Sequence, residues 1–280
     1  MNQAIFIALT GAGINAANDL MYRRAALNDK GNSIYLFYFI SSVSSALIAL
    51  IFCFIQNSYS LFSITDILYG LILGTLSFTA YILFLFTFKG SNASITVTIY
   101  RLNLIPGIVL AVLFLGEAIT LRKGAGILLC IATTLLFSGK GNVYQKKYYY
   151  MSIIACLACG VLNMMNKVAV LSGVNTFSML FWRFTVVAII SGGILLKKKP
   201  EIYKSKALIS PALSGLLLML SVFCTLSALK IGDVSAVIPI TQLSFVFVAA
   251  ISWIAFKESI NIRKIVGIFC SVAAVILIGG

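Results

Sequence analysis

The chain has 280 residues, 61% of them hydrophobic and 10% charged, and its mean hydropathy is +1.06. Soluble domains are typically about a quarter charged, so this composition excludes that class and favours a membrane protein. The formal net charge of +14 does not indicate a nucleic-acid partner, because the Lys and Arg residues lie between apolar runs, as they do at the flanks of membrane helices.

Apolar runs of the length that crosses a bilayer, roughly 17–25 residues, follow one another along the whole chain. The first run, within residues 1–20, lacks the basic region and cleavage site of a signal peptide, so we interpret it as a first span. The fold class predicted is an all-α polytopic membrane protein with ten spans. These spans are 3–23, 34–56, 65–88, 92–115, 121–138, 150–171, 176–196, 207–229, 233–256 and 262–279.

An internal repeat divides the chain into two halves, 1–139 and 140–280. A shift of 141 positions places Glu117 on Glu258 and aligns "LGEAITLRKGAGILL" with "FKESINIRKIVGIF" without a gap. Five spans in each half is an odd number, so the second half would enter the membrane from the opposite side. The sequence therefore predicts two inverted five-helix repeats.

The loop charges predict the orientation. Fifteen Lys and Arg residues lie in the loops on one side of the predicted bundle, and only Arg122, Lys123 and Lys230 lie on the other. Since cytoplasmic loops are enriched in Lys and Arg, both termini are predicted outside the cytoplasm, in a multi-pass protein of the cytoplasmic (inner or plasma) membrane.

Three basic residues, Arg101, Lys167 and Arg183, fall inside spans. A charge near the bilayer centre costs about 3 kcal/mol or more, so such a residue normally faces a cavity or a partner. Arg101 and Arg183 could grip an anionic group, or could instead contact helix-end carbonyls or a buried carboxylate. Lys167 is closer to its helix end and could extend to the interface.

Asp19 is the one acid well inside a span, four residues before Arg23. It could form a local ion pair with Arg23 or act as a proton-coupling carboxylate. Asparagines recur at three-residue spacing in the first and sixth spans, where they could join helices or line a solute path. They are Asn15, Asn18, Asn163 and Asn166.

Tyr100 and Arg101 have Thr241 and Gln242 as repeat partners, at equivalent depths in the fourth and ninth spans. Inverted repeats place substrates where the halves meet, so we predict a site at Tyr100, Arg101 and Gln242. Two prolines, Pro106 and Pro239, could bend these spans. Aromatic residues offer the alternative of a cage for organic cations. The candidates for the cage are Tyr22, Tyr81, Tyr100, Trp182 and Trp253.

No enzyme chemistry is predicted. The sequence has no His and no acidic cluster, so neither a His-carboxylate metal site nor a His-based triad can be built, and no cofactor is expected. Cys156 and Cys159 have redox spacing but lie in an apolar run, as core residues do. Glu117 and Glu258 are interpreted as structural acids that fix a turn beside a helix N-terminus.

The repeated motif resembles that of the EamA family of the drug/metabolite transporter superfamily. The segment "CGVLNMMNKVAVLSG" at 159–173 is similar to the family's sixth helix, with Lys167 seven residues after Gly160. The corresponding segment of the first half, "AGINAANDLMYRRA", departs from the family pattern, because Leu20 stands where a Lys is expected after Gly13. The resemblance implies a ten-helix carrier with a central cavity between its halves. It also implies cytoplasmic termini, against the loop charges.

We therefore predict a secondary active transporter of a small polar metabolite with an anionic group, amino-acid-like or an organic phosphate. The alternatives are a carrier of organic cations, a lipid-phosphate flippase and, from other classes, a membrane enzyme or a structural subunit. The expected partners are the substrate, a proton or an exchanged solute, and membrane lipids, with the chain a monomer or homodimer.

Overall fold

A computed structural model describes residues 2–27, 33–56, 63–87, 99–137, 146–198, 209–248, 251 and 262–279. Within these ranges all regular secondary structure is helical, which confirms the all-α class. The helices are α1 (Asn2–Leu27), α2 (Ser33–Ile55), α3 (Ile64–Thr87), α5 (Leu104–Leu115), α6 (Leu121–Leu136), α7 (Lys146–Leu171), α8 (Thr176–Lys198), α9 (Ile209–Ile231), α10 (Val234–Thr241) and α12 (Ile262–Gly279).

The helices have the length and surface of membrane spans. In the described part of the chain, six of them are long and apolar enough to cross a bilayer: α1, α2, α3, α7, α8 and α9. Shorter apolar helical stretches cover 99–115, 234–248 and 265–279. Large apolar side chains such as Phe6 and Leu113 point outward, 72% and 71% exposed, as they would toward lipid. The chain is an integral, multi-pass membrane protein.

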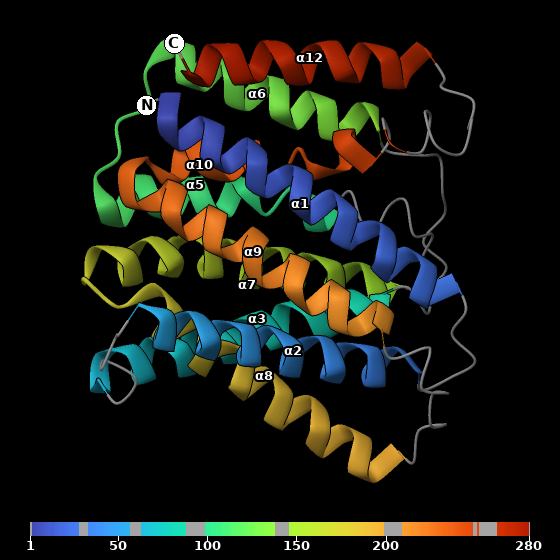
Figure 1. The fold of residues 1–280 in the computed structure, drawn as a ribbon. Helices are drawn as coiled ribbons and strands as arrows, with labels where there is room; N and C mark the ends of the chain where they lie inside the picture. The colour runs from blue at the N-terminus through green and yellow to red at the C-terminus, as the bar shows by residue number, and fades with distance from the viewer. Residues whose placement is uncertain are drawn as a thin grey trace.

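Both ends of the chain lie at the same end of the helix bundle (Figure 1). There α1 begins and α12 ends, and the turns at 116–120, 172–175 and 232–233 lie beside them. We call this the terminal end of the bundle. Its assignment to the outside of the cytoplasm stays a prediction from loop charge.

The helices pack in pairs that are exchanged by the repeat. Helix α1 packs along α9, and their repeat counterparts, α7 and α3, pack along each other. Helix α2 contacts its own counterpart α8, and α6 contacts its counterpart α12. One buried apolar cluster joins α1, α5, α6, α9, α10 and α12, and a second joins α2, α3, α7, α8 and α9. The two halves are therefore interleaved rather than set side by side.

Small residues allow the closest helix contacts. A Cβ added at Gly215 of α9 would collide with the Ser41 carbonyl oxygen of α2, and one at Gly70 of α3 would collide with the Cβ of Trp182 on α8. The Ser45 hydroxyl also donates to the Gly215 carbonyl at 2.8 Å. Small residues that permit close backbone approach, together with hydrogen bonds between helices, are typical of membrane helix packing.

Candidate functional site

Two helices are interrupted at nearly equivalent positions of the repeat. A helical turn at 99–101 is separated from α5 by a turn at 102–103, and α10 is followed by a turn at 242–243 and a helical segment at 244–248. Pro106 explains the first break, because its ring removes a donor and crowds the carbonyl of Leu102, which accepts from Ile105 N at 2.9 Å instead. Pro239 lies inside α10, just before the second break.

The breaks lie inside the membrane. At 1.5 Å per residue, the eight residues of α10 place Gln242 about 12 Å from the terminal end, near the middle of a hydrocarbon core of about 30 Å. Broken helices at this depth free backbone carbonyls for solute or ion contacts, as in many transporters.

Arg101 and Gln242 meet across the breaks. Arg101 Nη1 donates to the Gln242 carbonyl at 3.2 Å and to Ser244 Oγ at 3.3 Å, while Gln242 Nε2 donates to Asn103 Oδ1 at 2.9 Å. Arg101 with Gln242, and Asn103 with Ser244, are pairs 141 residues apart. Since each pair takes one residue from each half of the chain, the contact of Arg101 with Gln242 lies where the two halves meet.

Two of the expected asparagines extend this arrangement. Asn15 Nδ2 donates to Ser244 Oγ at 3.3 Å, and Asn163 Nδ2 donates to Asn103 Oδ1 at 3.0 Å. Each contact joins an asparagine of one half to a residue of the other half. We call the whole set of polar residues the central cluster: Asn15, Asp19, Arg101, Asn103, Asn163, Gln242 and Ser244.

The central cluster contains an ion pair. Asp19 Oδ2 lies 3.4 Å from Arg101 Nη2 and 3.4 Å from Ser244 Oγ, and the guanidinium of Arg101 lies over the ring of Phe245, 4.7 Å from its centroid. Charge-assisted hydrogen bonds are usually about 2.7–2.9 Å, so the pair is loosely closed. Its side chains are 16% exposed for Arg101 and 34% for Asp19. The side chain of Arg23, the local partner expected for Asp19, lies outside the described residues.

Arg183 lies beside a row of aromatic rings. Its Nη1 donates to Asn166 Oδ1 at 3.2 Å, and among the described residues its buried Nε has no partner. It is close enough to Tyr38 and Tyr100 for electrostatic contact. The row runs from α2 through α3 to Tyr100. Its ring centroids are 4.5 Å apart for Tyr38–Tyr81, 6.3 Å for Tyr81–Phe84 and 4.2 Å for Phe84–Tyr100.

Three expected site residues make helix contacts outside the central cluster. Lys167 Nζ donates to the Leu229 and Gly232 carbonyls at 2.7 and 2.9 Å, which caps the C-terminus of α9. Asn18 Oδ1 accepts from Ser214 Oγ at 2.6 Å between α1 and α9. Trp182 packs edge-on against Phe181 at 5.3 Å and stands over Gly70. All three contact neighbouring helices in this structure, and their part in a substrate site stays a prediction.

Glu117 joins the halves at the terminal end. Its carboxylate accepts from Val234 N at 2.7 Å, Ser235 N at 2.9 Å and Ser235 Oγ at 2.6 Å, at the N-terminus of α10. Lys123 Nζ lies 2.7 Å from Asp233 Oδ2. The geometry is that of an acid at a helix N-terminus, as interpreted from sequence. Its repeat partner Glu258 lies outside the described residues.

Replacing Glu117 with glutamine is expected to lower the free energy of unfolding by about 1–3 kcal/mol, since charged acceptors of backbone N–H groups are lost. Thermal unfolding of the purified protein measures this effect. Glu117→Ala should lower the melting temperature further, because no acceptor is left. A glutamine variant less stable than the alanine variant would contradict the capping role.

Replacing Pro106 with alanine is expected to restore an amide donor to the Leu102 carbonyl and to straighten this helix. Arg101 would then move away from Ser244, and transport should fall about tenfold or more while the protein stays folded, as a misplacement of about 1 Å can cost a hundredfold. Uptake in proteoliposomes, with melting temperature as the control, tests this. Unchanged uptake would show that the break does not position Arg101.

Sequence reasoning missed Asn103, Ser244 and Phe245. Their contacts depend on how the helices pack, but Asn103 and Ser244 are 141 residues apart, so the repeat register that selected Arg101 and Gln242 could also have found them. Among the described residues, no group of three or more His, Cys, Asp or Glu could hold a metal ion.

Interrupted membrane helices around a partly buried polar cluster, where two homologous halves meet, are typical of membrane transporters. The profile of the EamA-like transporter family matches the chain twice, at residues 2–139 and 146–280. The chain belongs to this family, a transporter family of the drug/metabolite transporter superfamily, which confirms the resemblance found in its motifs.

Solved structures share the fold. One crystal structure, described only as that of a protein, superposes with a TM-score of 0.77 over 99% of this chain and 95% of its own, at 14% sequence identity. At that identity the likeness concerns the fold alone. No curated protein matches the sequence.

Proposed function

We propose that this chain is a secondary active transporter of a small amino-acid-like metabolite across the cytoplasmic membrane. Two inverted five-helix repeats, 1–139 and 140–280, would alternately open the central cluster to each side. The observation that supports the substrate class is the loosely closed pair of Asp19 and Arg101, held by the interrupted helices at the repeat axis.

The charge balance of the central cluster favours a zwitterion. Arg101 is already neutralised by Asp19, so an anion alone would leave the carboxylate of Asp19 unpaired, at a cost of several kcal/mol in a water-poor site. An amino acid can replace this ion pair with two new ones, in which its carboxylate binds Arg101 and its ammonium binds Asp19. All four charges then stay paired. Asn15 and Ser244 supply further hydrogen-bonding groups beside them.

An organic phosphate is the second candidate. The observation that favours it is Arg183, which is 6% exposed, has an unpartnered Nε among the described residues and lies near Tyr100. If the guanidinium groups of Arg101 and Arg183 both turned toward one ligand, each could bind a phosphate with two parallel hydrogen bonds.

An organic cation is less favoured. It would compete with Arg101 both for Asp19 and for the face of Phe245. Of the expected aromatic cage, Tyr81 and Tyr100 line the aromatic row and Trp182 packs between helices. The side chain of Tyr22 and all of Trp253 lie outside the described residues.

Asp19 is the proposed coupling residue. A proton or an exchanged solute that neutralises the Asp19 carboxylate would break its contact with Arg101 and leave the guanidinium free to move. The loop charges favour termini outside the cytoplasm, so we propose that the terminal end of the bundle faces away from the cytoplasm.

Uptake into proteoliposomes tests the substrate class. The panel comprises labelled L-amino acids, glycerol phosphate and choline, with a fluorescent phospholipid to detect flipping. Uptake of one or more amino acids, saturable and blocked by unlabelled amino acid, is expected. Uptake of glycerol phosphate alone would establish the second candidate. Uptake of choline alone, or phospholipid flipping alone, would overturn the proposal.

A further inference from the structure

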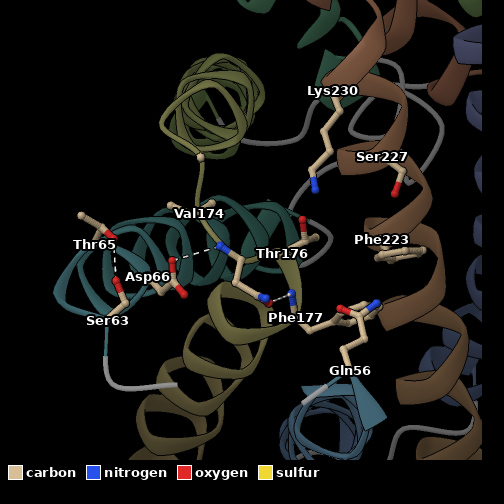
Figure 2. Close-up of a pocket in the computed structure, with 12 residues that line it drawn as sticks. Gln56, Ser63, Thr65, Asp66, Val174, Thr176, Phe177, Phe223, Ser227 and Lys230 are labelled. Atoms are coloured by element: carbon tan, nitrogen blue, oxygen red, sulfur yellow. Dashed lines mark hydrogen bonds between the residues drawn. The ribbon is translucent and has the colours of Figure 1, made fainter. Parts of the chain in front are cut away.

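A polar pocket opens at the terminal end, away from the central cluster (Figure 2). It lies between the end of α2, the start of α3, the turn from α7 to α8, and the last turns of α9, with a volume of about 510 Å³. Binding sites for small molecules typically have volumes of about 300–1,000 Å³. None of the central cluster residues lines it.

Two residues that line this pocket each carry a buried polar atom without a hydrogen-bond partner among the described residues. Asp66 is 2% exposed and Thr176 is 5% exposed, and within the described residues neither Asp66 Oδ2 nor Thr176 Oγ1 has a hydrogen-bond partner. Asp66 Oδ1 is held by the amide N–H of Asn175 at 3.1 Å, which fixes the carboxylate at the pocket wall. An unpartnered buried carboxylate oxygen costs free energy unless a ligand or water satisfies it. The wall is therefore built to accept a donor.

A cation and an aromatic face complete the lining. Lys230, from the last turn of α9, extends its ammonium end toward the side of the pocket that holds Thr176 (Figure 2). Phe223 stacks on Phe177 with ring centroids 4.8 Å apart and forms an apolar wall. The pocket thus offers an acceptor, a cation and a flat apolar surface.

We propose that this pocket is a second binding site, for a small zwitterion that carries an ammonium group, an anionic group and an apolar body. The ammonium group binds Asp66 Oδ2 and Thr176 Oγ1, the anionic group binds Lys230, and the apolar body lies on Phe223. The chemical class follows from the pocket itself. That the ligand is the transported metabolite, held before or after the central cluster, rests on the proposed function.

Three related probes separate the contributions of the charges. L-phenylalanine carries both charges, phenethylamine lacks the carboxylate, and phenylacetate lacks the ammonium. Equilibrium dialysis of the full chain in nanodiscs measures the stoichiometry and Kd of each. We expect Arg101→Ala protein, in which the central site is disabled, to retain one phenylalanine site per chain and to bind the other two probes about tenfold or more weakly, since each loses a charged hydrogen bond.

Variants of the pocket test the assignment. In the Arg101→Ala background, Asp66→Asn keeps the acceptor for the Asn175 amide but loses the charge, and should weaken phenylalanine binding about tenfold or more. Thr176→Val and Lys230→Gln should each weaken it severalfold or more, and they test the site even if Asp66→Asn does not fold. Arg122→Gln, on an exposed residue outside the pocket, is the matched control and should leave Kd unchanged.

The outcomes distinguish the two sites. Two phenylalanine sites in the unmodified protein, one removed by Arg101→Ala and the other by Asp66→Asn, would support both proposals. A single site removed by Asp66→Asn alone would support the pocket and contradict the central site. Binding unaffected by all three pocket variants, no phenylalanine binding, or equal affinity for phenethylamine would overturn the zwitterion pocket. Loss of phenylalanine binding when phosphatidylethanolamine is added to the discs would support the two-charge pocket and contradict a transported metabolite as its ligand, because this lipid headgroup carries the same two charges.

Discussion

Replacing Arg101 with alanine is expected to lower the initial rate of substrate uptake about a hundredfold or more. Removing one partner of a buried charge pair costs about 2–5 kcal/mol, and each 1.4 kcal/mol is a factor of ten. The change removes the proposed contact to the substrate carboxylate and leaves Asp19 with Ser244 as its remaining partner among the described residues. Uptake in proteoliposomes at matched protein density is the measurement. Asp19→Asn should cause a loss of similar size, because the guanidinium then remains buried without its counter-ion.

The double variant Arg101→Gln with Asp19→Asn separates stability from function. It removes both charges, so the melting temperature should recover toward that of the unmodified protein, while uptake stays absent because neither substrate charge has a partner. Arg122→Ala, at an exposed position of the terminal end, serves as the control with full uptake. Normal uptake by the folded double variant would show that the pair is structural and would remove the basis of the proposed function.

Replacing Gly215 with leucine is expected to destabilise the bundle by about 3 kcal/mol. A Cβ at this position already collides with the Ser41 carbonyl oxygen, and the rest of the side chain would force α2 away from α9. The hydrogen bond from Ser45 to the Gly215 carbonyl would then be lost as well. A lower melting temperature and an aggregated fraction in size-exclusion chromatography are the readouts.

Gly193 offers the matched control for this change. It lies on α8 at an exposed position where an added Cβ meets nothing within 4 Å. Gly193→Leu should therefore leave the melting temperature unchanged or raise it, because leucine is a better helix former than glycine. Equal destabilisation by the two substitutions would show that helix contacts at Gly215 are not what limits stability.

The fold class and the family were predictable from the sequence because their signals are local or periodic. An apolar run of membrane-spanning length predicts a helix that crosses the bilayer, whatever that helix packs against. The 141-residue repeat likewise selects Arg101 and Gln242 as equivalent, and their contact at 3.2 Å needs only that two halves meet at an axis. The sequence predicted Glu117 beside a helix N-terminus from its place at a turn, but the helix that it caps, α10, begins 117 positions away and was decided by tertiary structure.

The partners of the charged residues were decided by tertiary structure alone. Asp19 could be matched from sequence only with its helical neighbour Arg23, whereas its partner in the structure, Arg101, is 82 positions away on another helical segment. Lys167 and Trp182 were predicted as site residues by type, and the helix packing decides which groups they contact, the α9 carbonyls and Gly70. Inside a bilayer every charge and every free carbonyl needs a partner. Which partner it has depends on how the helices cross, and local sequence patterns do not predict these crossings.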